Sequence, residues 1–113
     1  MHELGVTQSI IDITLAKAGE AHAGKVLKIN LVVGELSGFV PDCIQFYFDT
    51  LSKGTIAEGA VLNVETVPPE LRCRNCSTVF EFQDAPWTCP KCLSQSIEVS
   101  KGRELYIESV EVE

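Results

Sequence analysis

The sequence has no long hydrophobic run: no apolar stretch approaches the ~20 residues that a membrane-spanning helix needs. No basic segment precedes an apolar one at its start, so we expect no secretory signal, no membrane association and a cytoplasmic location. Positive charge is scarce as well. Only 9 Lys and Arg stand against 16 Asp and Glu in 113 residues, a net charge of −7. That balance argues against binding nucleic acid mainly through its phosphates.

Histidine is scarce too, whereas cysteine is abundant. The 2 histidines leave little material for general acid–base chemistry, so we expect a protein that is not an enzyme. Hydrophobic residues make up 45% of the chain, enough for a small folded core. The 5 cysteines are many for this length. A reducing cytosol disfavours disulfides, so paired cysteines there indicate metal ligands or redox centres.

The hydrophobic pattern predicts an α+β fold with two helices and a small three-stranded antiparallel sheet. We expect helices over 3–18 and from Pro41 to a stop at Gly54, and strands over 26–33, 61–67 and 105–112. In the last strand the alternation slips near Ser109, which indicates a bulge. The first helix should bury one broad apolar arc, made of Leu4, Val6, Ile10, Ile11, Ile13, Leu15 and Ala18.

A segment of different composition, 70–103, separates the last two strands. It carries five basic and four acidic residues, whereas the rest of the chain carries four basic and twelve acidic ones. All four paired cysteines lie in it. We therefore predict an acidic, discontinuous domain formed by 1–69 and 104–113, with 70–103 inserted as a separate metal-binding module.

The paired cysteines are Cys73 and Cys76, then Cys89 and Cys92, with 12 residues between the pairs. Two residues between cysteines let a tight turn aim both sulfurs at one ion, and a hairpin brings the second pair opposite. Soft thiolates in this arrangement favour structural Zn²⁺ with no open coordination position, as in a zinc ribbon. Two redox dithiols or a rubredoxin-like iron site are the alternatives.

The amino terminus is a second candidate metal site. The Met1 amine, the His2 backbone nitrogen and the His2 imidazole can close two fused chelate rings on one ion, and Glu3 adds a carboxylate. Nitrogen-rich square-planar coordination suits Ni²⁺ or Cu²⁺. The alternative is that His2 is only a frayed terminal residue.

Four further residues each allow two interpretations, an ordinary structural role or a role in metal binding. His22 ends the first helix, and Cys43 is expected as a small buried residue of the second. Glu35 and Asp42 flank a glycine-containing loop. Each is either a solvated acid or helix-start charge, or lies near a metal or a partner.

The combination of these features resembles the HypA/HybF family. It rests on the Met1-His2-Glu3-Leu4 start, the 33–37 stretch Val-Gly-Glu-Leu-Ser, and CxxC followed by CPxC before a final acidic strand. The resemblance covers essentially the whole chain. It implies a nickel metallochaperone for [NiFe]-hydrogenase maturation, with Ni(II) as transient cargo on Met1, His2 and Glu3, and structural Zn(II) on Cys73, Cys76, Cys89 and Cys92.

The resemblance also implies partners: the HypB-type nickel GTPase and the hydrogenase large subunit. Because some family members also serve urease, urease maturation proteins are a further expectation. For oligomeric state we expect a monomer or a weak homodimer, since the small sheet has exposed strands. Two departures stand out: Gly5 replaces the Ser that many relatives carry after MHEL, and the insert has no histidine.

The competing interpretation is a zinc-ribbon module that binds nucleic acid or a transcription factor. It requires a basic, aromatic-studded face. The insert offers only a modest one, made of Arg72, Arg74, Lys91, Lys101 and Arg103.

Overall fold

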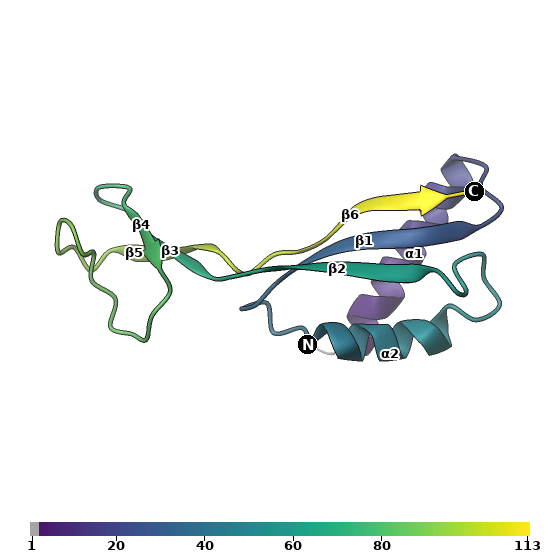
Figure 1. Cartoon of the computed structure of the whole chain (residues 1–113), viewed down its shortest axis with the longest axis horizontal. Helices are drawn as coiled ribbons and strands as arrows, with labels where there is room; N and C mark the ends of the chain where they lie inside the picture. The colour runs from purple at the N-terminus through teal and green to yellow at the C-terminus, as the bar shows by residue number, and fades with distance from the viewer. Residues whose placement is uncertain (1–2) are drawn as a thin grey trace.

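The computed structural model describes residues 3–113, so the predicted ligands Met1 and His2 lie outside the described residues. The chain is elongated, about 55 × 25 × 17 Å, with one three-stranded sheet toward each end (Figure 1). No helix among residues 3–113 is long and apolar enough to cross a membrane. The elements are α1 (Glu3–Glu20), β1 (Val26–Gly34), α2 (Pro41–Leu51), β2 (Val61–Val67), β3 (Glu70–Cys73), β4 (Val79–Glu81), β5 (Ile97–Lys101) and β6 (Leu105–Val112).

The larger sheet has the strand order β2-β1-β6 and confirms the predicted α+β class. One detail of the prediction is wrong: the sheet is mixed, because β1 pairs parallel with β2 and antiparallel with β6. The reason is the α2 crossover. A chain that leaves β1, runs back along a helix and enters β2 arrives in the same direction. The bulge is confirmed, since Asn30 pairs with Ser109 but Leu31 pairs with Ile107.

Helix α1 buries the middle of the predicted apolar arc, including Val6, Ile10, Ile11 and Ala18, but not its two margins. The buried residues are Val6, Thr7, Ile10, Ile11, Thr14 and Ala18. Leu4 and Ile13 are 48% and 50% exposed, because they lie on the two margins of that face. Thr7 tolerates burial because its hydroxyl donates to the Glu3 carbonyl at 2.6 Å.

The burial of β1 departs from the simple alternation of a half-buried strand. Leu27 is 41% exposed and Val26 is fully buried, because a register shift between Val26 and Lys28 interrupts the pleat. Beyond that shift Ile29, Leu31 and Val33 join the core. This core also takes Ile44 and Phe48 from α2, which begins at Pro41 as expected.

The two sheets meet where two glycines replace side chains. A Cβ on Gly34 would collide with the backbone of Gly102, and a Cβ on Gly102 would lie 2.8 Å from the Cα of Pro69. The loop after β1 is hydrogen-bonded to both chain segments that link the two sheets. The Leu36 amide donates to the Gly102 carbonyl, between β5 and β6, at 2.6 Å. The Glu35 amide donates to the Val67 carbonyl, at the end of β2, at 3.0 Å. Hydrogen bonds therefore hold the loop at the end of β1 against both segments that link the two sheets.

The smaller sheet, β4-β3-β5, is antiparallel and has its own small core. Its buried residues are Leu71, Cys73, Cys89 and Ile97, with Phe80, Trp87 and Val99 packed against them. Trp87 also meets Phe82 edge to face at 5.9 Å. The predicted domain boundaries at 69/70 and 103/104 remain a prediction.

Candidate metal centre

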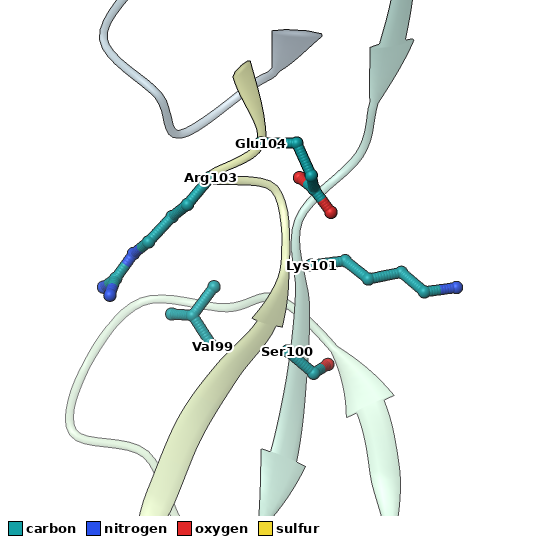
Figure 2. A pocket seen from close by; sticks show the side chains of 5 residues that line it. All are labelled: Val99, Ser100, Lys101, Arg103 and Glu104. Atoms are coloured by element: carbon teal, nitrogen blue, oxygen red, sulfur yellow. The ribbon is translucent and has the colours of Figure 1, made fainter. Parts of the chain in front are cut away.

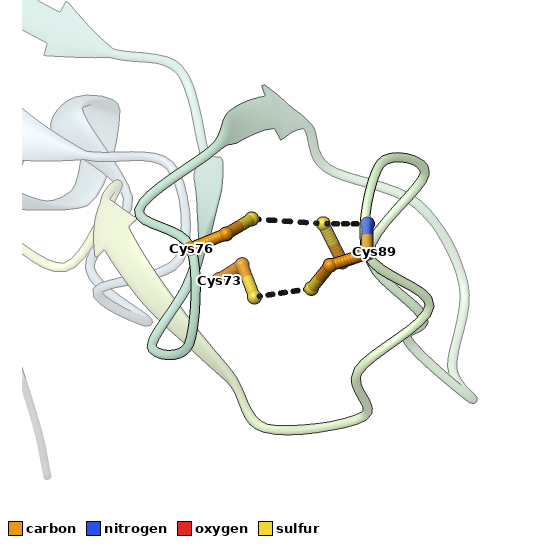
Figure 3. A group of neighbouring side chains, drawn as sticks. Cys73, Cys76 and Cys89 are labelled. Atoms are coloured by element: carbon orange, nitrogen blue, oxygen red, sulfur yellow. Dashed lines mark hydrogen bonds between the residues drawn. The ribbon is translucent and has the colours of Figure 1, made fainter.

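The four paired cysteines converge at one point of the smaller sheet. All four Sγ atoms lie within 4.8 Å of one another. The Sγ atoms of Cys73 and Cys92 are 3.6 Å apart, as are those of Cys76 and Cys89. Figure 3 shows the two cysteine-bearing turns facing each other across this cluster. Because a disulfide bond is only about 2.05 Å long, these sulfurs are not paired as disulfides.

The two cysteine pairs are held by matching turns. The amides of Ser77 and Leu93 donate to the carbonyls of Cys73 and Cys89 at 2.9 and 3.0 Å. Ser77 and Leu93 both adopt left-handed φ, +65° and +64°, which bends the chain back after each pair. Both turns are the consequence of the CxxC spacing, and they aim two sulfurs from each side at the same place.

Hydrogen bonds lower the pKa of two of the four thiols, those of Cys76 and Cys89, whereas the pKa of Cys92 is raised. The Thr78 hydroxyl lies 3.0 Å from Cys76 Sγ, and this contact, with a backbone bond from Thr78, lowers the pKa of Cys76 from 9.0 to about 6. The backbone amide of Cys92, then that of Lys91, lower the pKa of Cys89, each donating to its sulfur at 3.4 Å. Thiolates are the form that binds metal.

The donor set and its spacing fit a structural zinc ion. A tetrahedral Zn²⁺ with Zn–S bonds of about 2.3 Å separates its sulfurs by about 3.8 Å, close to the 3.6 Å between the Sγ atoms of Cys73 and Cys92 and of Cys76 and Cys89. Cys73 and Cys89 are fully buried, whereas Cys76 and Cys92 lie at the surface. Four thiolates would complete the coordination shell of the ion, so it would hold the turns together and leave no position for a substrate.

An ion-paired cluster supports the first cysteine turn, and sequence reasoning missed it. Glu98 on β5 accepts from Arg72 Nε at 2.8 Å and from Arg74 Nε at 3.2 Å. Arg74, then Arg72, lower the pKa of Glu98. A second missed residue is Asn75, whose amide nitrogen lies 3.6 Å from Cys92 Sγ. Proximity to the CxxC motif could have indicated Asn75 and Thr78, but nothing in the sequence indicates Glu98.

The acidic residues predicted near the amino-terminal site lie in two places. Glu3 begins α1, and its Oε2 accepts from the backbone amide of Val40, the residue just before α2, at 3.3 Å. Asp42 is exposed in the first turn of α2, so it lies near the same contact. Glu35 is exposed beside the junction of the sheets. Within residues 3–113, the four cysteines are the only group of three or more metal-binding side chains close enough to share an ion.

Two other residues received ordinary interpretations from the sequence. Cys43 is exposed on α2, so its expected burial is wrong; Ile44 and Phe48 are the α2 residues that face the core. His22 follows α1 with φ +55°, and its amide donates to the Gly19 carbonyl at 3.1 Å. It therefore takes part in the turn that ends the helix.

A cavity of about 310 Å³ lies where β5 continues toward β6, lined by Val99, Ser100, Lys101, Arg103 and Glu104. Figure 2 shows Lys101 and Arg103 extending to opposite sides of the strand. Glu104 turns back to accept from the Gly102 amide at 2.7 Å. The charged side chains that line this cavity point away from one another, so they do not converge on a common ligand.

Comparison with known proteins places the chain in a family. A family model described as "Hydrogenase/urease nickel incorporation, metallochaperone, hypA" matches residues 1–112. The chain belongs to the HypA family. Hydrogenase maturation factor HypA of Dehalococcoides mccartyi is 44% identical over the whole chain and 95% of that protein. The HypA of Geobacter sulfurreducens is 39% identical over the full length of both.

Solved HypA structures share this fold. The solution structure of a HypA protein superposes with a TM-score of 0.80 at 27% identity, covering 99% of this chain and 96% of that one. The solution structure of the Ni metallochaperone HypA from Helicobacter pylori gives a TM-score of 0.70 at 27% identity, over 99% and 97% of the two chains. HypA proteins are metallochaperones, so the role of this family is metal delivery in enzyme maturation rather than catalysis.

Proposed function

We propose that this chain binds Ni(II) at its amino terminus and delivers it to a maturing [NiFe]-hydrogenase, while the four cysteines hold a structural zinc ion. Its membership in the HypA family, across residues 1–112, carries this proposal. The proposed nickel ligands are the Met1 amine, the backbone nitrogen and imidazole of His2, and Glu3. Nitrogen donors in this sequence suit a square-planar Ni(II) ion.

The surroundings of Glu3 support an exchangeable site here. Helix α1 begins at Glu3, and the Glu3 carboxylate contacts the start of α2 rather than entering the core. Asp42 adds a second exposed carboxylate at the start of α2. Ligands at one end of a chain can pass an ion to a partner without unfolding the core. Asp42, and more remotely Glu35, are therefore proposed as neighbours of the nickel site or of a partner.

Delivery requires partners, and a hydrogenase maturation factor works with the maturation machinery of its enzyme. The proposed partners are a HypB-type nickel GTPase and the hydrogenase large subunit. Urease maturation proteins are further candidates, because the family description names urease as well. The proposed location is the cytoplasm, where free thiols such as those of the metal centre stay reduced.

The nickel site is tested by His2→Ala and, separately, by extending the chain before Met1. His2→Ala removes the imidazole donor, and the extension turns the Met1 amine into an amide that is no longer terminal. We therefore expect each change to lower the nickel affinity by at least tenfold, about 1.4 kcal/mol. Isothermal titration of the untagged, zinc-loaded chain with Ni(II) measures it. Affinity should also fall as the pH drops through about 6.5, because the imidazole must be neutral to bind.

The matched control is His22→Ala, which changes the other histidine of the chain. It should retain the nickel affinity of the unmodified chain, and all variants should retain zinc. Unchanged nickel affinity in both His2→Ala and the extended chain would refute the proposed site.

The alternative of a nucleic-acid-binding zinc ribbon receives less support. Two of the five basic residues of the insert, Arg72 and Arg74, are already paired with Glu98. Their charge is therefore partly neutralised within the module itself. A gel-shift assay at low salt separates the two functions, because a nucleic-acid-binding module would retard DNA or RNA there.

A further inference from the structure

Strand β6 forms a free edge of the larger sheet. In the order β2-β1-β6 it pairs with β1 alone, so one row of its backbone amides and carbonyls has no strand partner among residues 3–113. Such an edge is a template for another strand, and natural proteins usually blunt it. Eight residues, Leu105–Val112, make this a long edge for a chain of this size.

An apolar groove runs beside this edge, between α1 and β6. Two neighbouring cavities of about 230 and 320 Å³ form it, and Ile13 of α1 and Ile107 of β6 line both. Ile10 and Leu31, both buried, form part of its floor. Half of Ile13 and half of Tyr106 remain exposed. Side chains of an added strand could therefore pack against the open margin of α1.

The charge along this edge has one sign. Glutamates 108, 111 and 113 lie on β6 or next to it, and no Lys or Arg occurs from 104 to 113. None of the ion pairs among residues 3–113 involves these three carboxylates, although Glu111 accepts a hydrogen bond from Asn30 Nδ2 at 3.2 Å. Glu108 and Lys17 both line the groove, and Lys17 is paired with Glu20 of α1 at 3.7 Å. An occupant with basic side chains would neutralise this row.

The same charge disfavours a second copy of this chain as the occupant. Pairing two β6 strands would place glutamates of both copies along one seam, and each chain carries a net charge of −7. Like charges facing each other across paired strands are destabilising. A strand from a different protein carries no such penalty.

We propose that the β6 edge and the α1–β6 groove form a docking site for an extended segment of a partner protein, one that alternates apolar and basic residues. The segment adds a strand to β6. Its backbone completes the open hydrogen bonds of the edge, its apolar side chains fill the groove beside Ile13, and its basic side chains meet the glutamates. Neither the four cysteines nor Glu3 lines this groove.

The probe is a synthetic peptide of the length of β6 in which valine and lysine alternate. It is titrated into the full, zinc-loaded chain at low salt, and binding is followed by amide chemical shifts. We expect shifts concentrated at 105–110 and along the Ile13 side of α1. Two comparison peptides replace every lysine by glutamate or methylate alternate backbone nitrogens. Each should bind at least about tenfold more weakly, because one loses charge complementarity and the other loses strand pairing.

Ile13→Asp should weaken binding of the lysine peptide by a similar factor. Phe46→Asp is the matched control, because Phe46 is a 68% exposed hydrophobic residue on the other helix, away from the groove. It should bind as the unmodified chain does, and neither variant should alter nickel or zinc binding. The proposal is wrong if the peptide shifts other strands, if the glutamate peptide binds equally well, or if nothing binds at millimolar concentration. Shifts at β6 that grow with protein concentration alone would identify a second copy as the occupant instead.

Discussion

Cys76 and Cys43 are both exposed, but their thiols have different surroundings. Cys76 Sγ lies 3.6 Å from Cys89 Sγ and 3.0 Å from the Thr78 hydroxyl, which lowers its pKa to about 6. It is therefore largely a thiolate near neutral pH and ready to bind metal. Cys43 stands on α2, outside the four-cysteine cluster.

We expect Cys76→Ser to abolish tight zinc binding, because a neutral hydroxyl replaces one of four thiolates. Metal analysis of the purified chain after dialysis against a mild chelator measures the retained zinc. Cys43→Ser is the control and should retain one zinc ion per chain. If Cys76→Ser kept the same zinc content through that dialysis, the four-thiolate site would be refuted.

At the scale of elements, the decisive contacts join β1 to the two connections between the sheets. The glycine at the end of β1, Gly34, packs against the backbone of Gly102 so closely that no side chain fits. The amide of Gly34 also donates to the Glu104 carbonyl at 2.7 Å. These contacts explain why β1 ends on a glycine.

Gly34→Ala should destabilise the chain by about 1–3 kcal/mol, the usual cost of forcing a methyl group into a packed site. Urea unfolding followed by circular dichroism measures the change. The control is Gly5→Ala in α1, where an added Cβ has nothing within 4 Å. It should be neutral or stabilising by up to about 1 kcal/mol, because alanine favours helix. Equal stability of the two variants would contradict the close packing at Gly34.

At the scale of the whole molecule, the chain has two hydrophobic clusters of unequal strength. The larger contains twelve buried residues from α1, α2, β1 and the 57–60 turn. The smaller contains four, and two of these, Cys73 and Cys89, are the proposed zinc ligands. Without zinc the smaller cluster would keep only Leu71 and Ile97 as buried aliphatic residues.

Complete removal of zinc by a strong chelator should therefore unfold 70–103 and leave the α1–β1–α2–β2–β6 part folded. A segment this short rarely folds without a metal or disulfide. Hydrogen exchange resolved by residue measures the result: protection should vanish in β3, β4 and β5 and persist in β1. Retained protection in β3 without zinc would contradict this, and loss of protection everywhere would show that the two parts unfold together.

Local patterns determined much of this protein by themselves. Strand spans 61–67 and 105–112, the helix start at Pro41 and the bulge near Ser109 follow from alternation, proline geometry and register, which are short-range properties. The CxxC spacing likewise predicted the clustering of Cys73, Cys76, Cys89 and Cys92, because each turn is local and one hairpin brings the two together.

Only the tertiary structure decided which neighbours each element meets. The parallel β1–β2 pairing depends on the α2 crossover, and the buried face of α1, with Thr7 and Thr14 inside and Ile13 at the margin, depends on the sheet beneath it. Likewise, Glu98 reaches two arginines far away in sequence. Hydrophobic periodicity gives the angle of a stripe on a helix but not the partner that covers it. For the same physical reason, the free β6 edge and its groove became visible only in three dimensions.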